Sequence, residues 1–236
     1  MRTQRTLDVT VDAPYRRIDS DAWDDIYVVG DVHGCRETLE RLLELLAPGR
    51  NDLVVLVGDL VRKGPDSEGV LELVRSRPNV RSVRGNNEQK LLDGRESLDS
   101  LTDGELAYLR SLPAVITWDD SAVVHGGIDH RKPVGEHVLG DLLNTRSLAP
   151  ESGYERPFWF ETRRELPRVF FGHTVLAEPF ESEYAVGLDT GCVYGGRLTA
   201  YDYRASELIA VEPPETYCSR SQDGIVEPRS PVPGVQ

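Results

Sequence analysis

Six side chains of the kinds that bind metal ions stand at the ends of short apolar runs in this chain: Asp31, His33, Asp59, Asn86, His125 and His173. Carboxylates, imidazoles and an amide oxygen delivered from successive strand ends suit a pair of divalent transition metals, with one carboxylate bridging both. A lone Gly-Asp-x-His-Gly piece could equally be a turn that caps a helix. Five such pieces in one order favour a metal site over a purely structural role.

The elements that must position these residues alternate between strand and helix. The apolar runs 26–30 and 52–58 each read as a buried strand. The first leads into a helix over 35–47, and the second into a helix over 65–76 that begins at Pro65 or Asp66. A third run, 80–85, leads into 86–92. This βαβαβ order predicts an α/β core whose chemistry lies at the carboxyl ends of the strands.

The second half of the chain shows more strand than helix. A helix is expected over 104–112, where Pro113 ends it. Residues 114–118 and 121–127 read as a hairpin, and 168–174 and 186–203 supply later strands. We predict one domain over 26–211, because 236 residues suffice for a single sizeable core. An N-terminal segment, 1–25, and a Pro- and Ser-rich tail, 212–236, have little to bury and are expected to be partly mobile.

The formal charge of −13 limits the partners of this chain. An acidic protein binds nucleic acid and anionic membranes poorly, so any phosphate must be held locally by metal ions and a few arginines. Only three lysines are present, which indicates either a halophilic source or an arginine-rich genome. The N-terminus lacks the apolar centre of a secretion signal, and the cytoplasm is the expected location. Three widely spaced cysteines predict reduced thiols.

Six stretches resemble the successive motifs of the calcineurin-like metallophosphoesterases: GDVHGC, GDLVRKGP, RGNNE, VVHGGI, FFGHT and GLDTGCVYGGRLTAY. The resemblance is strongest to the branch that holds the PPP-type serine/threonine protein phosphatases and the symmetric diadenosine tetraphosphatases, and it covers about residues 26–204. It implies an α/β (α+β) fold in which helices flank a central β-sandwich. It also implies two divalent ions, usually manganese and otherwise iron or zinc.

The resemblance further implies a role for each motif residue. Asp31 and His33 would bind the first ion, Asp59 would bridge both, and the second would be completed by Asn86, His125 and His173. Phosphoester hydrolysis would follow in-line attack by a hydroxide held between the ions.

Substrate contacts are expected from nearby cations. Arg84, Arg146 and Arg62 are candidates to bind phosphoryl oxygens, because guanidinium groups bind them bidentately. Lys63 occupies the position where the protein phosphatases carry a phosphate-binding arginine. Arg84 could instead be an ordinary surface residue.

Asn87 departs from the family pattern at a catalytic position. The resemblance implies a histidine there that protonates the leaving oxygen, and the protein phosphatases pair it with an aspartate where this chain has Arg62. The diadenosine tetraphosphatases also lack that aspartate but keep the histidine, so Asn87 is the more serious departure. An amide donates a hydrogen bond but cannot transfer a proton. Three explanations are open: a substrate that leaves without an acid, an engineered substitution, or loss of catalysis.

Three functions therefore compete. The motifs favour a phosphatase acting on phosphorylated protein, with VVHGGI as support, and Asn87 and Arg84 in its active site. The alternative is a polyphosphatase acting on nucleotides, supported by GDLVRKGP and by tolerance of the missing acid. The third is a metal-binding scaffold or sensor without turnover. Among the other polar residues, Asp189 is expected to orient a ligand, whereas His130 and His137 lie in a polar loop and are expected to be solvated.

Overall fold

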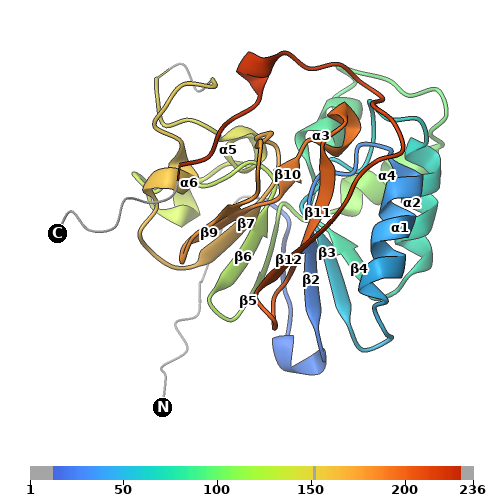
Figure 1. Cartoon of the computed structure of the whole chain (residues 1–236), viewed down its shortest axis with the longest axis horizontal. Helices are drawn as coiled ribbons and strands as arrows, with labels where there is room; N and C mark the ends of the chain where they lie inside the picture. Colours follow the sequence, from blue (N-terminus) through green and yellow to red (C-terminus); the bar gives the residue numbers. More distant parts are fainter. Residues whose placement is uncertain (1–12, 151–152, 230–236) are drawn as a thin grey trace.

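The computed structural model describes residues 13–150 and 153–229, and its core is a pair of sheets packed face to face (Figure 1). One sheet has the order β1 (Tyr15–Arg17), β5 (Val115–Trp118), β6 (Ser121–Val124), β7 (Arg168–Phe171), β9 (Ala185–Gly187) and β8 (Phe180–Glu181). The other has the order β10 (Asp189–Thr190), β11 (Arg197–Asp202), β2 (Ile26–Val29), β3 (Leu53–Leu56) and β4 (Val80–Ser82), and β12 (Glu207–Val211) pairs with β11. Helices flank both sheets, which confirms the predicted sandwich.

The βαβαβ prediction is confirmed in the second sheet. Strands β2, β3 and β4 are parallel neighbours, with Val28 opposite Val55. The crossovers contain α1 (Arg36–Leu46) and α2 (Ser67–Ser76). Parallel strands end at one edge of a sheet, so the residues that follow them gather at that edge.

Helix α1 forms where apolar residues recur at helical spacing. Its buried side is made by four leucines: Leu39, Leu42, Leu43 and Leu46. Helix α2 begins after Asp66, whose carboxylate accepts a hydrogen bond from the backbone N–H of Gly69 at 2.7 Å. The predicted start of this helix is therefore confirmed.

The core between the sheets is made of inward-facing aliphatic and aromatic side chains. Val28 and Val55 from one sheet meet Trp118 and Phe170 from the other, and all four are fully buried. Trp118 and Phe170 stack with their ring centroids 5.9 Å apart. This packing fixes the two sheets relative to one another, and with them the loops at their ends.

The remaining helices are short: α3 (Asn86–Leu92), α4 (Asp103–Ser111), α5 (Leu139–Asn144) and α6 (Trp159–Thr162). The predicted hairpin is confirmed, because β5 and β6 pair in antiparallel register with Val115 opposite Val124. Helix α3 lies at the end of the second sheet where β3 and β4 finish (Figure 1).

Both terminal segments contribute to the folded structure. Strand β1 pairs in parallel with β5, so residues 15–17 of the predicted N-terminal segment extend the first sheet. In the C-terminal segment, Val226 is buried and its backbone N–H donates to the carbonyl of Val175 at 2.8 Å. The red segment in Figure 1 passes over the same end of the molecule as α3. Residues 1–12 and 230–236 lie outside the described residues, so their predicted mobility stays a prediction.

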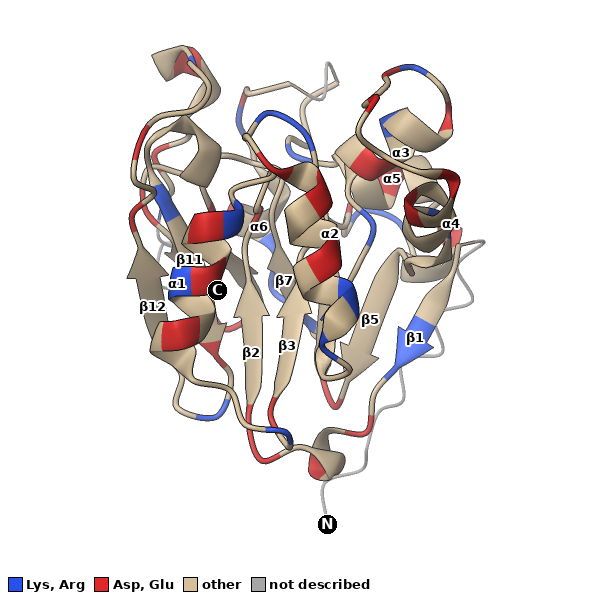
Figure 2. Ribbon diagram, turned by 90° about the vertical axis from the view of Figure 1, so that its right-hand side faces the viewer, with Lys and Arg blue, Asp and Glu red and all other residues tan. Residues whose placement is uncertain are grey.

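Acidic residues recur along α1 and α2, with basic residues among them (Figure 2). Within the described ranges, no helix is long and apolar enough to cross a membrane.

Candidate metal centre

The six predicted ligands gather at one edge of the sandwich, and each is at most 9% exposed. Asp31 and His33 follow β2, Asp59 follows β3, and Asn86 is the first residue of α3, after β4. His125 and His173 follow β6 and β7 of the other sheet. Residues from both sheets therefore meet in one buried site.

A buried group of two carboxylates and one imidazole has the geometry of a metal site. Asp31, Asp59 and His125 each offer a ligand atom, and these atoms lie within 4.8 Å of one another. The Nε2 atom of His125 is 3.3 Å from Oδ1 of Asp59.

Asn86, His125 and His173 form a second convergence next to this group. The Oδ1 atom of Asn86 is 2.9 Å from Nε2 of His125 and 2.9 Å from Nδ1 of His173. His125 donates from Nδ1 to the carbonyl of Val57 at 2.9 Å, because a carbonyl can only accept. Its Nε2 atom therefore carries a lone pair that faces the oxygens of Asn86 and Asp59. Three acceptor atoms that face one another in this way can bind one cation between them.

His33 belongs to the other side of Asp59. Its Nε2 atom is 3.8 Å from Oδ2 of Asp31 and 3.5 Å from Oδ2 of Asp59. The ammonium of Lys63 donates to this Nε2 at 2.8 Å. An ammonium in this position stands in for a metal cation bound by His33 beside the two carboxylates.

The electrostatics of the centre also suit cations. Burial, followed by the charges of Asp189 and Asp59, raises the pKa of Asp31 well above its usual value. Burial also lowers the pKa of His33 to about 3 and moves that of His125 in the same direction, so both rings are neutral. Neutral imidazoles and carboxylates that repel one another are the donor set that binds divalent transition metals. The residues present therefore fit a metal ion.

Several of these residues hold unusual backbone conformations. His33 has φ 50°, Asp59 has φ 49° and His173 has φ 64°, all in the left-handed region. Each such residue costs about 1–3 kcal/mol, and such conformations cluster at functional sites. The neighbouring glycines permit close approach, since a Cβ atom on Gly172 would lie 1.9 Å from Oδ1 of Asp31.

Glu88 holds the turn that carries Asp59, and sequence reasoning missed it. Its carboxylate accepts backbone hydrogen bonds from Asp59 at 2.9 Å, Leu60 at 2.8 Å and Gly85 at 2.7 Å. Glu88 is fully buried. The signal was the last letter of GNNE, because a buried glutamate next to a turn needs several donors.

Asn87 is fixed on both sides of its amide. Its Nδ2 donates to Oδ2 of Asp59, and its Oδ1 accepts from Nη1 of Arg62 at 2.6 Å. Arg62 in turn pairs with Glu96 at 3.0 Å. An amide and a guanidinium, neither of which can transfer a proton at neutral pH, therefore stand beside the centre.

The other predicted substrate contacts divide into two groups. Arg146 reaches the centre, with Nη2 3.3 Å from Nδ1 of His173, as does Lys63. The guanidinium of Arg84 is directed elsewhere: it donates to the carbonyls of Arg110 at 2.5 Å and Leu112 at 3.1 Å. Arg84 is buried, so it is not the surface residue that the alternative suggested, and it anchors the end of α4.

Two more sequence expectations concern polar residues. The predicted solvation of His137 is wrong, because the ring is buried and its Nε2 accepts from the backbone N–H of Asp129 at 2.9 Å. Asp189 is buried, as a group that orients ligands would be, and it accepts from the N–H of Gly191 at 3.1 Å.

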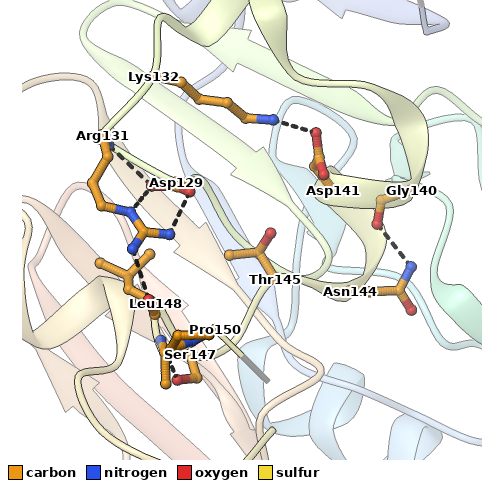
Figure 3. Close-up of a pocket in the computed structure, with 11 residues that line it drawn as sticks. Asp129, Arg131, Lys132, Gly140, Asp141, Asn144, Thr145, Ser147, Leu148 and Pro150 are labelled. Carbon is orange, nitrogen blue, oxygen red and sulfur yellow. Dashed lines mark hydrogen bonds and ion pairs between the residues drawn. The ribbon is translucent and has the colours of Figure 1, made fainter. Parts of the chain in front are cut away.

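A separate cavity is about 320 Å³ in volume (Figure 3). It is lined by Asp129, Arg131, Lys132, Gly140, Asp141, Asn144, Thr145, Ser147, Leu148, Ala149 and Pro150. Its cations are already paired with carboxylates. Arg131 binds Asp129 at 2.8 Å, and Lys132 binds Asp141 at 2.6 Å. It therefore offers an anion less than the metal centre does.

The fold and the buried Asp/Asp/His group define a metallophosphoesterase. The family model for calcineurin-like phosphoesterases matches residues 25–190, and this chain belongs to that family. The resemblance noted in the sequence is confirmed.

The similar proteins are named either as a serine/threonine-protein phosphatase or as tetraphosphatases. The serine/threonine-protein phosphatase 1 of Salmonella typhimurium is 31% identical, over 78% of this chain and 94% of its own. The symmetrical bis(5'-nucleosyl)-tetraphosphatase of Chromohalobacter salexigens is 29% identical, over 79% of this chain and 97% of its own. A crystal structure provisionally named a diadenosine tetraphosphatase matches with a TM-score of 0.75 and 32% identity, over 85% of this chain and 98% of its own.

Proposed function

We propose that this protein is a metal-dependent phosphohydrolase that cleaves dinucleoside polyphosphates. The observation that carries the proposal is the Asn87–Arg62 pair, which stands beside the centre and bonds to Asp59 and Glu96. The sequence motifs favoured a protein phosphatase, whereas the similarity to tetraphosphatases supports this alternative.

The metal ions would be held by Asp31 and His33 on one side, by Asn86, His125 and His173 on the other, and by Asp59 between them. Manganese is the expected ion, with iron or zinc as alternatives. When bound, such ions lower the pKa of a water molecule to near neutrality and neutralise the phosphoryl oxygens.

The leaving group follows from the side chains around Asn87. A serine or threonine alkoxide is a strong base and needs a proton as it leaves, and a general acid typically contributes 10² to 10⁴ in rate. A nucleotide that leaves from a phosphoanhydride is a weak base and carries its own negative charge. Arg62 can neutralise that charge if it exchanges its contact with the half-exposed Glu96 for the leaving phosphate, and the amide of Asn87 holds the guanidinium in place.

A cluster of cations beside the centre suits a substrate with several phosphates. Arg62 donates to Asn87 of α3, and Lys90 lies one turn further along the same helix. A hollow of about 200 Å³ is lined in part by Asn86 and Lys90. In a chain of charge −13, Arg62, Lys63 and Lys90 are the cations that we infer to contribute to binding of a polyanion.

A protein phosphatase is the second candidate, because the relative with that name is 31% identical over most of this chain. The test is turnover of diadenosine tetraphosphate, a phosphoserine peptide and p-nitrophenyl phosphate by the manganese-loaded protein, with Asp59→Asn as the inactive control. We expect cleavage of the dinucleotide and the aryl ester and little cleavage of the peptide. Peptide cleavage without dinucleotide cleavage would support the second candidate. A protein that turns over none of the three would be a scaffold or sensor.

A further inference from the structure

Five side chains form an alternating row of cations and aromatic rings at the mouth of the metal centre: Lys63, Tyr194, Arg220, Tyr154 and Arg146. We call this row the cation–aromatic arch. Its members come from separate parts of the chain, including the C-terminal segment that supplies Arg220. The five residues do not share one motif, and the sequence analysis did not predict a functional role for either tyrosine or for Arg220.

The members of the arch contact one another in order. The Lys63 ammonium lies 5.3 Å from the ring centroid of Tyr194, and the guanidinium of Arg220 lies 4.9 Å from the same centroid. Arg220 also lies 5.5 Å from the centroid of Tyr154, and Arg146 lies 4.9 Å from it on the other side. These are cation–π distances.

Both ends of the arch reach candidate metal ligands. The Lys63 ammonium is 2.8 Å from Nε2 of His33, and Nη2 of Arg146 is 3.3 Å from Nδ1 of His173. The ring of Tyr194 also meets that of His33 edge-on, with centroids 6.5 Å apart. A molecule whose phosphate lies at the centre would therefore extend along the arch.

Arg220 is held in place by the segment that carries it. The backbone N–H groups of Tyr217 and Cys218 donate to the carbonyl of Val193 at 3.1 and 3.0 Å, which fastens the segment beside Tyr194. Nε of Arg220 donates to the carbonyl of Gly224 at 2.7 Å, and its Nη1 donates to the hydroxyl of Tyr194 at 3.2 Å. The guanidinium is thus aimed at the rings and not into solvent.

The cations of the arch have no carboxylate partner within 4.0 Å among residues 13–150 and 153–229. Arg131 and Lys132, in the cavity of Figure 3, are both paired with aspartates. Three cations left unpaired in an acidic chain are available to an anionic ligand.

We propose that the cation–aromatic arch binds the nucleoside end of the substrate and that Arg220 determines specificity for it. A base would displace the Lys63 ammonium from the Tyr194 ring and stack on that ring in its place, and the phosphate next to the ribose would bind Arg220 and Arg146. This inference rests on the proposed function, because it assigns the part of a nucleotide that lies beyond the cleaved bond. A phosphoserine peptide offers no ring to this surface.

The binding test compares two ligands that differ only in the nucleoside: α,β-methylene adenosine diphosphate and methylenediphosphonate. Each is titrated by calorimetry into the full-length, manganese-loaded protein, which cannot hydrolyse the P–C–P link. We expect the nucleotide to bind at least tenfold more tightly. Tyr194→Leu should weaken nucleotide binding by about 5- to 100-fold and change diphosphonate binding less than about twofold.

Substitutions at Tyr194 and Arg220 test the contribution of the aromatic ring separately from that of the positive charge. Arg220→Gln should weaken both ligands, and Tyr194→Phe should keep stacking while losing the hydroxyl that accepts from Arg220. Arg229→Gln is the matched control, since Arg229 is exposed in the same segment and should bind both ligands as the unaltered protein does. Melting temperatures close to that of the parent protein verify that the variants fold.

The outcomes distinguish this inference from the proposed function. Equal affinity for the two ligands, or an unchanged preference in Tyr194→Leu, would overturn the arch even if dinucleotides are hydrolysed. Preferential binding of a phosphotyrosine peptide over the nucleotide would overturn it in favour of an aryl phosphate site. Tight nucleotide binding without any turnover would keep the arch and reject the proposed function.

Discussion

Restoring a histidine at position 87 tests the central argument about the leaving group. In Asn87→His the new imidazole would lie beside Arg62, whose Nη1 is 2.6 Å from Oδ1 of Asn87. The protein phosphatases place an aspartate where Arg62 stands. We therefore expect the single variant to gain little and the double variant Asn87→His/Arg62→Asp to gain much more.

The size of the effect follows from the charge of Arg62. Two unit charges about 4 Å apart interact by about 4 kcal/mol at an effective dielectric constant of about 20. The Arg62 side chain is 18% exposed and paired with Glu96, so we take about half of this, or about 1.5 pKa units against the imidazolium. The imidazole of the single variant would then be almost entirely neutral at pH 7. Its rate on alkyl phosphates should rise less than about tenfold, against about 10² to 10⁴ for the double variant.

The assay is kcat/KM for a series of aryl and alkyl phosphates, with Asn87→Gln as a control that keeps an amide. Rates on p-nitrophenyl phosphate should change little in any variant, because p-nitrophenolate is a weak base. In the double variant, alkyl phosphate turnover should fall as pH rises through the pKa of the new imidazole. Equal gains on aryl and alkyl substrates would refute the reasoning, and so would a single variant that performs as well as the double one.

Four other measurements test the centre and the surface. Asp59→Asn should reduce turnover at least about 10³-fold with the fold intact, because it removes the predicted bridging carboxylate, and near-normal activity would exclude that role. Glu88→Gln should lower the free energy of unfolding by about 2–4 kcal/mol in a denaturant titration, since the amide NH₂ group would face two of the four backbone donors that the carboxylate now accepts from. Manganese at about 100 times its Kd should raise Tm by about 5–10 °C over protein in EDTA, and an unchanged Tm would argue against binding to the folded state. If the source is halophilic, Tm should rise toward molar KCl, and a flat response favours an arginine-rich genome.

The parallel half of the fold and the ligand cluster were predictable because they depend on local patterns. Continuous apolar runs indicate buried strands, and leucines such as Leu39 and Leu43 at helical spacing indicate α1. Once the strands are parallel, Asp31 and Asp59 must finish at one edge, whatever the details of packing. His125 and His173 also follow apolar runs, but the placement of their strands, β6 and β7, in a separate facing sheet followed from the family resemblance and not from these patterns.

Arg84, Tyr194 and Arg220 were beyond sequence reasoning for a different physical reason. The direction of a long side chain is set by its tertiary neighbours: Arg84 follows β4 directly, yet the carbonyls at the end of α4 capture its guanidinium. The arch needs the C-terminal segment to cross the end of the sandwich, which rests on a few contacts such as those of Val226. A Pro- and Ser-rich composition carries no signal for such contacts, because they are made by backbone groups that every residue has.

The exchange of a histidine–aspartate pair for Asn87 and Arg62 changes the charge of the site as well as its proton chemistry. It replaces a carboxylate with a guanidinium that precedes Lys63 in the chain and contacts Asn87 of α3, in a protein of net charge −13. A monoester dianion can be held by two metal ions and one or two cations, so further cations near the leaving group add little to its binding. A polyphosphate carries negative charge on both sides of the cleaved bond, and it benefits from cations on both sides. If the proposed function holds, loss of the acid and gain of the cation are two consequences of the same substrate, and a variant that restores only one of them should serve neither substrate well.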